Sequence, residues 1–474
     1  MNYPKHNKIL LLLAVAIALA GCAAIPDDAQ SVARRDLAGI ELAQGIKLAR
    51  EGWPQALWWQ AYGDAQLDAL MARALKDGPT LASAQARVRQ AEAGMAQTDA
   101  NGGLHATLDA SINRQYLSGT GLFPPPLGGA WYTEPKVGLN ASYEFDWWGK
   151  HHSQVAASLG EVHARRAEEK QAELTLTVAV AQSYFTLQSD RARLASLKER
   201  RALQHKLVEG RARRVAQGLE PVANRAREEG QRAAFDAQIA TLEAAIGRQH
   251  EAIRALIGGG ELAELQTVQP PHANPSLPAT LGNELLARRP DLQAARWRVE
   301  STISAEAAQQ AAFYPTISIA GFAGFDTITT EKLFDLASRQ FNLIPAISLP
   351  IFDAGRLQAQ LGGKRAERDA VIAEYNQAVV NAVRDITQDG IALQGLAREE
   401  GAQRRQLAAQ RQVLASSEAQ LKQGLVDRTA LWNATLPVLA QNDALIQLNQ
   451  RQLDAELALI KALGGGYRAP GSQE

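Results

Sequence analysis

Cysteine is almost absent from this chain: among 474 residues there is one, Cys22. A single cysteine excludes a disulfide within the chain and the cysteine-rich classes of metal site. An excess of either charge is absent as well, because 50 lysines and arginines face 50 aspartates and glutamates. The chain therefore has no bulk attraction for nucleic acid, and no nucleic-acid partner is expected.

A long hydrophobic run is also missing. The apolar run Ile9–Ala20 is too short to cross a bilayer as a helix, and no other segment qualifies. It follows a basic start and ends in Leu19-Ala20-Gly21-Cys22. This pattern resembles a bacterial lipoprotein signal, so we expect residues 1–21 to be removed and Cys22 to carry lipid, palmitate included. A plain secretory signal is the alternative.

Catalytic motifs are missing too. His151-His152 lies near Asp146 and could suggest a metal, but no HExxH motif or paired-ligand spacing supports it. The Gly-Gly-Gly runs at 258–260 and 464–466 lack the Lys-Ser/Thr of a phosphate loop and are typical of helix stops. The sequence therefore predicts no enzyme, no metal and no cofactor.

What the chain does have is two pairs of segments in which apolar and polar residues alternate. We expect strands at about 104–116 and 136–147, and again at about 315–326 and 341–352. Aromatic residues stand at the ends of the first pair. In a secreted lipoprotein this pattern favours the wall of a membrane β-barrel, with the apolar face toward lipid and the polar face toward water. Alternation alone would also suit a soluble sheet.

The polar positions of the first strand pair are the candidate lumen residues. They are Asp109, Asn113, Lys136, Asn140, Ser142 and Glu144. Both signs of charge occur among them, so we expect weak ion selectivity. In the second pair, Phe322 is an apolar exception on the polar face.

Long helical stretches follow each strand pair. We expect helical hairpins at 150–258 and 355–463, with first arms about 100 Å long. Before the strands, helices are expected at Leu67–Ala100 and Pro290–Ala312, and Pro437 should kink the last helix. A seven-residue spacing predicts a supercoiled seam in that helix. The seam consists of Leu425, Trp432, Leu439, Ile446, Leu453 and Ile460.

The two halves carry the same landmarks at a constant offset. Gly149, Gly218 and Gly258 recur 206 residues later as Gly355, Gly424 and Gly464. This indicates an internal two-fold repeat. The expected organisation is a signal peptide (1–21), a lipidated linker and arm (22–65), a first repeat (66–260), a Pro-rich equatorial connection (261–289), a second repeat (290–466) and a tail (467–474).

Three tryptophans, Trp53, Trp58 and Trp59, cluster in the arm. They could form a ligand box, but packing of the arm onto helices is the favoured interpretation.

Four spanning strands cannot close a barrel with a watery lumen, and open sheet edges are not tolerated in lipid. Several chains must therefore pool their strands. Helices about 100 Å long cannot lie within a membrane, so they must project from it side by side as a tube.

Seven stretches carry a resemblance to a known family. They are LWWQAYGDAQLDAL, ALKDGPTLASAQARVRQAEA, VGLNASYEFDWWGK, RRPDLQAARWRVES, AAFYPTISI, LPIFDAGR and ALGGGY. Together they resemble the outer-membrane factor family of TolC-type efflux channels, in its lipidated OprM/NodT-like branch. The resemblance implies a homotrimer with a 12-stranded β-barrel in the outer membrane of a Gram-negative bacterium and a periplasmic α-barrel of twelve helices. It also implies docking to a periplasmic adaptor and an inner-membrane pump, and passive export of small toxic compounds.

The hairpin turns are then the candidate periplasmic gate. The residues concerned are Gly218, Leu219 and Glu220 in the first turn and Gly424, Leu425, Asp427 and Arg428 in the second. In resembling channels an acidic residue near the second turn contributes to the constriction, and Asp427 is the best match. Asp427 could equally cap the following helix, and the two roles are compatible.

Two alternatives stay open at this point. The same architecture could serve as a conduit for secreted polypeptides, since only the partner pump would differ. A member of another class would be a pore-less periplasmic lipoprotein built as a coiled-coil spacer, against which the alternating strands argue.

Overall fold

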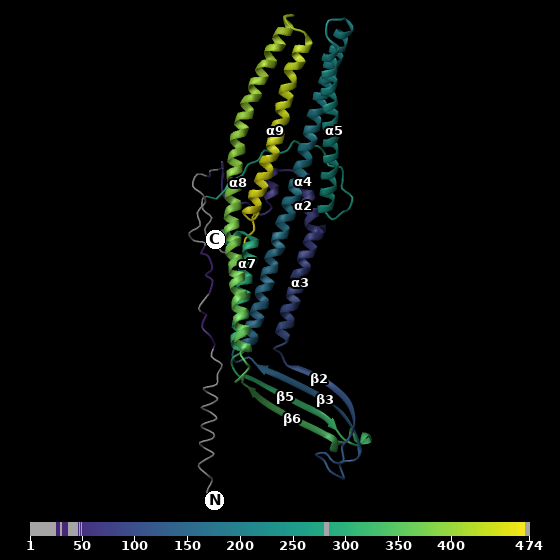
Figure 1. Ribbon diagram of the computed structural model, residues 1–474, viewed down its shortest axis with the longest axis vertical. Coiled ribbons are helices and arrows are strands. Elements are labelled where there is room, and N and C mark those ends of the chain that lie inside the picture. Colours follow the sequence, from purple (N-terminus) through teal and green to yellow (C-terminus); the bar gives the residue numbers. More distant parts are fainter. Residues whose placement is uncertain are drawn as a thin grey trace. The chain divides into compact units, whose positions relative to one another are not determined.

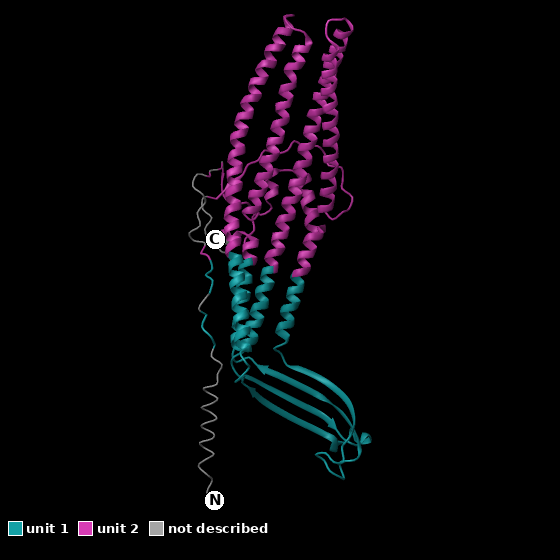
Figure 2. Cartoon of the chain, viewed as in Figure 1, with its two compact units in different colours: residues 1–34, 88–164, 295–375 teal, residues 35–87, 165–294, 376–474 magenta. Residues whose placement is uncertain are grey.

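The computed structural model describes residues 25–28, 31–36, 46, 48, 50–278 and 284–469. The expected signal peptide and Cys22 lie outside these residues. The chain forms two compact units, each built from three separate stretches (Figure 2). Unit 1 comprises residues 1–34, 88–164 and 295–375, and unit 2 comprises residues 35–87, 165–294 and 376–474.

Helices make up most of the described chain (Figure 1). In chain order the elements are β1 (Arg50–Glu51), η1 (Trp58–Tyr62), α2 (Ala65–Asp77), α3 (Pro79–Ala100), β2 (His105–Tyr116), β3 (Trp131–Phe145), α4 (Lys150–Ala216), α5 (Val222–Leu256), β4 (Ser276–Leu277), α6 (Glu284–Arg288), α7 (Pro290–Ala311), β5 (Thr316–Asp326), η2 (Thr330–Lys332), η3 (Leu336–Ser338), β6 (Arg339–Ser348), α8 (Arg356–Lys422) and α9 (Arg428–Ala462). Among the described helices, none is both long and apolar enough to cross a membrane.

Unit 1 contains an antiparallel sheet with the strand order β2-β3-β5-β6 (Figure 1). Its register sets Leu108 opposite Leu139, Leu139 opposite Ala323, and Ala323 opposite Phe341. Because side chains alternate along each strand, one face of the sheet is mostly apolar, with Arg114, Thr133 and Arg339 as its polar members. Most of its large side chains are exposed. β6 ends at Ser348, earlier than expected, and Pro350 just beyond has no N–H to extend the ladder.

Phe322, the exception on the polar face, is only 7% exposed. Its ring fills the space beside Gly138 and Gly324, where added Cβ atoms would collide with it. The Lys136 ammonium lies 4.4 Å from the ring centroid. Two opposed glycines thus create a slot for one aromatic ring, and a cation covers it.

The two helical hairpins have matching dimensions. α4 and α8 each contain 67 residues, and α5 and α9 each contain 35. All their bounds differ by 206 positions. At 1.5 Å per residue the longer arms measure about 100 Å. α9 continues through Pro437 as one helix.

The seam of α9 is not buried within the chain. Of its six positions only Leu453 belongs to the core, and the others are exposed or half-buried. The residues of α9 that this chain itself buries include Ala434, Val438 and Leu448, on other positions of the helix. The seam is therefore left available to a neighbouring helix.

One helix prediction was wrong. The stretch Leu67–Ala100 is not a single helix, because it is divided at Gly78 into α2 and α3. Gly78 has an extended backbone, with φ −66° and ψ 118°. The residue before a proline is disfavoured in the α conformation, and Pro79 begins the new helix.

The core of unit 2 joins the arm to the helices. Trp58 and Trp59 are buried beside α2 and α4 residues such as Tyr184. The Tyr184 hydroxyl donates to Asp64 over 2.7 Å, and Asp64 also caps α2. Packing is thus the role of two of the three tryptophans, whereas Trp53 is half-buried beneath the Arg288 guanidinium, 5.0 Å away.

The long helices begin at aspartate caps. Asp146 accepts hydrogen bonds from the backbone N–H groups of His151 and His152 at 2.9 and 2.8 Å. Asp353 likewise accepts from Gly355 and Leu357 at 3.1 and 2.8 Å. The Asp146 carboxylate is therefore engaged by backbone amides rather than imidazoles, and no metal-like group of three acids, histidines or cysteines occurs in the described part of the chain.

Helices α4 and α7 pack closely against each other in unit 1, at Gly160 and Ser301. A Cβ on Gly160 would lie 2.9 Å from Cβ of Ser301. We expect Gly160→Ala to lower the free energy of unfolding by about 1–3 kcal/mol through overpacking. The control is Gly247→Ala in α5, where no atom lies within 4 Å, and where alanine should raise stability by up to about 1 kcal/mol. Thermal unfolding followed by circular dichroism measures both, and equal stability of the two variants would contradict the expectation.

Candidate functional site

Both hairpin turns have the same backbone. Gly218 and Gly424 adopt left-handed φ values of 69° and 73°. Each helix end is closed by a pair of hydrogen bonds. These are Leu219 N to Arg214 O (2.9 Å), Gly218 N to Val215 O (3.0 Å), Leu425 N to Gln420 O (2.9 Å) and Gly424 N to Leu421 O (3.0 Å). A residue with a side chain would be strained at either glycine, which explains the shared Gln-Gly-Leu sequence.

Both turns expose a leucine at the same position. Leu219 is 66% exposed and Leu425 is 70% exposed. A single exposed leucine is ordinary. Equivalent leucines held outward by two identical turns are a better candidate for contact with another protein.

Asp427 has two roles at once. Its Oδ1 accepts from the Ala430 N–H at 3.1 Å, which caps α9. Its Oδ2 accepts from Nη1 of Arg214 at 3.0 Å, so it links the second turn to the end of α4. In the first turn Pro221 stands at the cap position of α5 and makes no side-chain cap.

Arg214 also reaches the acid of the first turn. Its Nε lies 3.0 Å from Oε1 of Glu220, which accepts from Arg211 at 2.7 Å as well. The Glu220 side chain is 10% exposed, whereas that of Asp427 is 52% exposed. An exposed ion pair contributes at most about 1 kcal/mol. The link between the hairpins is therefore the weaker half of this cluster and can be broken without dismantling the first turn.

Arg428 is exposed and forms no ion pair with any described residue. All the turn residues singled out in the sequence thus lie at the two turns. Sequence analysis missed the contact of Arg214 with Asp427, because the two residues are 213 positions apart.

The six candidate lumen residues share the polar face of the sheet. Asp109 Oδ2 accepts from Oγ1 of Thr107 at 2.8 Å and from Nδ2 of Asn140 at 2.7 Å. Lys136 Nζ lies 3.9 Å from Asp326, and Lys150 Nζ lies 3.3 Å from Glu144. The strand register sets Asn113 and Ser142 on this face as well. Asp326 and Phe322 belong to the same surface and were missed as site residues.

Aromatic side chains stand at both ends of the sheet. Tyr116 and Trp131 pair at one end, with ring centroids 5.6 Å apart. At the other end Trp148 stacks on Tyr314 at 4.9 Å and donates to the carbonyl of Pro315 at 2.7 Å. An apolar face bounded by aromatics at both ends matches a membrane-facing surface.

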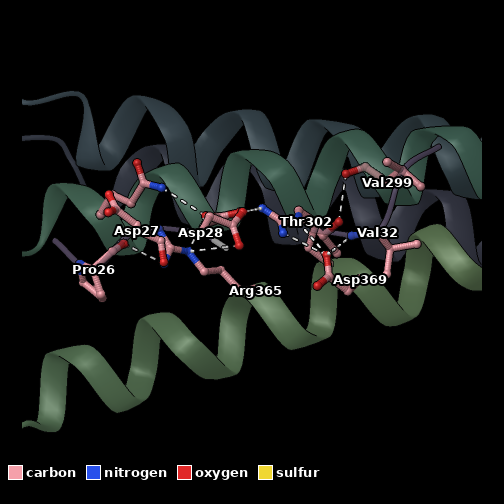
Figure 3. A network of polar contacts seen from close by, with 11 residues as sticks. Pro26, Asp27, Asp28, Val32, Val299, Thr302, Arg365 and Asp369 are labelled. Carbon is pink, nitrogen blue, oxygen red and sulfur yellow. Dashed lines mark hydrogen bonds and ion pairs between the residues drawn. The ribbon is translucent and has the colours of Figure 1, made fainter. Parts of the chain in front are cut away.

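A charged cluster fastens the N-terminal segment to unit 1 (Figure 3). Arg368 of α8 donates to Asp28 at 2.7 Å and to Glu306 of α7 at 2.6 Å. Arg365 donates to Glu306 at 3.1 Å and to the carbonyl of Pro26 at 2.7 Å. The hydrogen bond from Arg368 holds the pKa of Asp28 below its ordinary value. The segment that follows Cys22 is thus fixed to two helices, which sequence analysis did not foresee.

Removing Arg368 tests this clamp. Arg368→Met leaves the buried Glu306 with one cation fewer, which should cost about 3 kcal/mol. We expect hydrogen exchange in residues 31–36 to become roughly 100-fold faster. Arg384→Met, on the same helix but in an exposed pair with Asp385, should leave that exchange unchanged. Equal exchange in the two variants would show that the clamp is not what holds the segment.

Comparisons with known proteins agree with this fold. The family model described as outer membrane efflux protein matches residues 70–259 and 281–465. The multidrug resistance outer membrane protein MdtP of Shigella flexneri is 39% identical over 475 residues, which cover 98% of this chain and 97% of the relative. The protein MdtQ of Escherichia coli O157:H7, also named a multidrug resistance outer membrane protein, is 32% identical over 485 residues, covering 99% of this chain and 100% of the relative.

A solved structure agrees with both relatives. The outer membrane protein VceC of Vibrio cholerae superposes with a TM-score of 0.77 and 30% identity, covering 88% of this chain and 100% of VceC. The resemblance inferred from the sequence motifs is confirmed. The chain belongs to the outer membrane efflux protein family.

Proposed function

We propose that this chain is the outer-membrane channel of a tripartite efflux system. It conducts small toxic compounds passively from a periplasmic adaptor and an inner-membrane pump to the exterior. The observation that carries this proposal is a four-stranded sheet with an exposed apolar face, one polar face and two edges that pair with no other described strand. The multidrug resistance names of the relatives support small compounds as the cargo.

The strand arithmetic requires more than one copy of the chain, and membership of the efflux family supports three copies, a homotrimer. A closed barrel needs about eight strands, and lipid does not tolerate open edges. Three copies of the four-stranded sheet supply twelve strands, enough for a lumen. The half-buried seam of α9 supports the same assembly, because a seven-residue apolar spacing suits a neighbouring helix.

The internal repeat explains how one chain contributes to such a ring twice. The bounds of the two hairpins differ by 206 positions throughout. The family model also matches two stretches, one in each half. Each half then supplies two strands to the barrel and two helical arms to the tube.

Lipid at Cys22 would anchor the chain to the outer membrane. The clamp of Arg365 and Arg368 on residues 26–28 supports this, because it fixes the chain close to the anchor point on the unit that carries the sheet. Lipidation and the clamp would together attach unit 1 to the membrane surface.

The hairpin turns would close the tube at its periplasmic end. In this proposal the Arg214–Asp427 pair holds the two turns of a chain together in the closed state. The exposed Leu219 and Leu425 would contact the adaptor. Arg428 remains a candidate for contacts made only in the assembled tip.

Mass, shape and conductance test the channel. The lipidated protein, solubilised in detergent, should scatter light as three chains and show a tube with one detergent belt by electron microscopy. In planar bilayers it should give discrete conductance steps. A monomer without a belt and without conductance would leave a pore-less lipoprotein and overturn the proposal.

Two substitutions can separate the ion pair of Asp427 from its role as a helix cap. Asparagine caps helices as well as aspartate does, so Asp427→Asn should keep the cap and lose only the ion pair. We expect it to raise the open-to-closed ratio of single channels by up to about fivefold for each pair lost, since an exposed pair contributes up to about 1 kcal/mol. Arg214→Gln should do the same.

Two further variants supply the controls. Arg225→Gln removes an exposed pair with Glu229 inside α5, and it should leave the open-to-closed ratio unchanged. Asp427→Ala should in addition lower helix stability by about 1 kcal/mol through loss of the cap. If Asp427→Asn gates like the wild type, Asp427 is only a cap.

A further inference from the structure

A partly enclosed cavity lies within unit 2, between the arm, the connection that follows α5, and α9. Its volume is about 590 Å³. Trp53, Trp58 and Tyr62 of the arm line it, together with Glu456 and Ile460 of α9. The lining combines these aromatic rings with a larger share of polar groups, and a cavity of this size can hold a small molecule.

Two polar side chains in this cavity are poorly satisfied. Glu456 is 5% exposed, and its Oε1 accepts from the Asn274 N–H at 3.1 Å. Its Oε2 is buried, and the Tyr62 hydroxyl beside the carboxylate lowers the pKa of Glu456 but forms no hydrogen bond of ordinary geometry with it. A buried carboxylate with so few donors is costly. Such a group in a folded protein needs an explanation.

The chemistry of the two atoms defines what would satisfy them. A carboxylate oxygen requires a donor, and it gains most from a charged N–H. The phenol oxygen can accept a second N–H from the same group. The indoles of Trp53 and Trp58 offer flat apolar walls for the rest of a ligand. From this geometry we propose that the cavity binds a small organic ammonium ion with an apolar body, held by Glu456 and Tyr62.

The surrounding charges agree with a cation. The titratable groups lining the cavity are Arg50, Glu51, Tyr62, His272 and Glu456. Among these groups one arginine faces two carboxylates, which gives the lining a negative formal charge when both are ionised. Arg50 lies near enough to lower the pKa of Glu456, but it makes no ion pair with it. The site therefore keeps a free negative charge for a ligand.

Protonation of Glu456 should control the site. Burial raises the pKa of Glu456 to about 7. Above pH 7 the carboxylate is charged and can hold an ammonium ion, whereas below it the proton occupies the same oxygen. Affinity should therefore fall about tenfold for each pH unit below 7. Above pH 7, therefore, no proton competes with the cation for the Glu456 carboxylate.

Calorimetric titration of the solubilised full-length protein with tryptamine tests the proposal. Tryptamine should bind at pH 8.5 and at least about tenfold more weakly at pH 5.5. Tryptophol, which replaces the ammonium by a hydroxyl, should not bind at either pH. A titration into protein-free micelles removes the contribution of partition into detergent.

Matched variants assign the binding to the cavity. Glu456→Gln keeps the shape but should abolish binding and its pH dependence, and Tyr62→Phe should weaken binding several-fold. Asp454→Asn changes the same charge on the same helix outside the cavity lining and should bind like the wild type. His272→Gln should keep the pH dependence, which assigns it to Glu456. Light scattering checks that every variant assembles as the wild type does.

Three outcomes would overturn the proposal. One is equal binding of tryptophol and tryptamine, which would indicate a merely apolar pocket. Another is unchanged binding by Glu456→Gln. The third is no heat in the wild type at pH 8.5, which would leave Glu456 and Tyr62 to each other and to buried water. None of these outcomes bears on conductance, so the channel proposal stands or falls separately.

Discussion

Backbone hydrogen bonding at the sheet edges is the constraint on which the molecule depends. β2 and β6 each pair on one side only among the described strands, and the sheet between them carries an exposed apolar face. Water can form hydrogen bonds with the free N–H and C=O groups of the edges, but exposing the apolar face to water costs free energy. Lipid covers the apolar face without that cost, but it cannot form hydrogen bonds with the edges. Closing the edges with further copies of the same sheet meets both demands. Assembly of several copies follows from this single requirement, and the number three is what the resemblance to TolC-type channels implies.

The two halves of the chain differ at the turns of their helical hairpins. Both turns use a left-handed glycine and the same pair of closing hydrogen bonds. Only the second turn carries an aspartate at the cap position, because Pro221 occupies it in the first. That one departure lets Asp427 reach Arg214 of the other hairpin. In the proposed gate this contact would break and re-form without unfolding either arm.

Two buried carboxylates, those of Glu306 and Glu456, have different surroundings. Glu306 is met by Arg365 and Arg368, and the result is a fastening for the N-terminal segment. Glu456 has one oxygen without a hydrogen bond of ordinary geometry, and it faces a cavity rather than a paired cation. A satisfied charge is typical of a structural joint. An unsatisfied one beside empty space is typical of a binding site, and this contrast separates the two clusters.

The sequence by itself determined the features that repeat along the backbone. The alternation of the strands, the length of the hairpins, the turn residues and the polar face all follow from local periodicity and from glycine and proline. The break at Gly78 was present in the same signals and was overlooked. Tertiary structure alone decided the contacts between distant positions: Phe322 beside two glycines, Asp28 with Arg368, Asp427 with Arg214, and Glu456 in its cavity. The physical reason is that periodicity assigns a residue to a face, whereas its partner depends on which segments the fold brings beside that face.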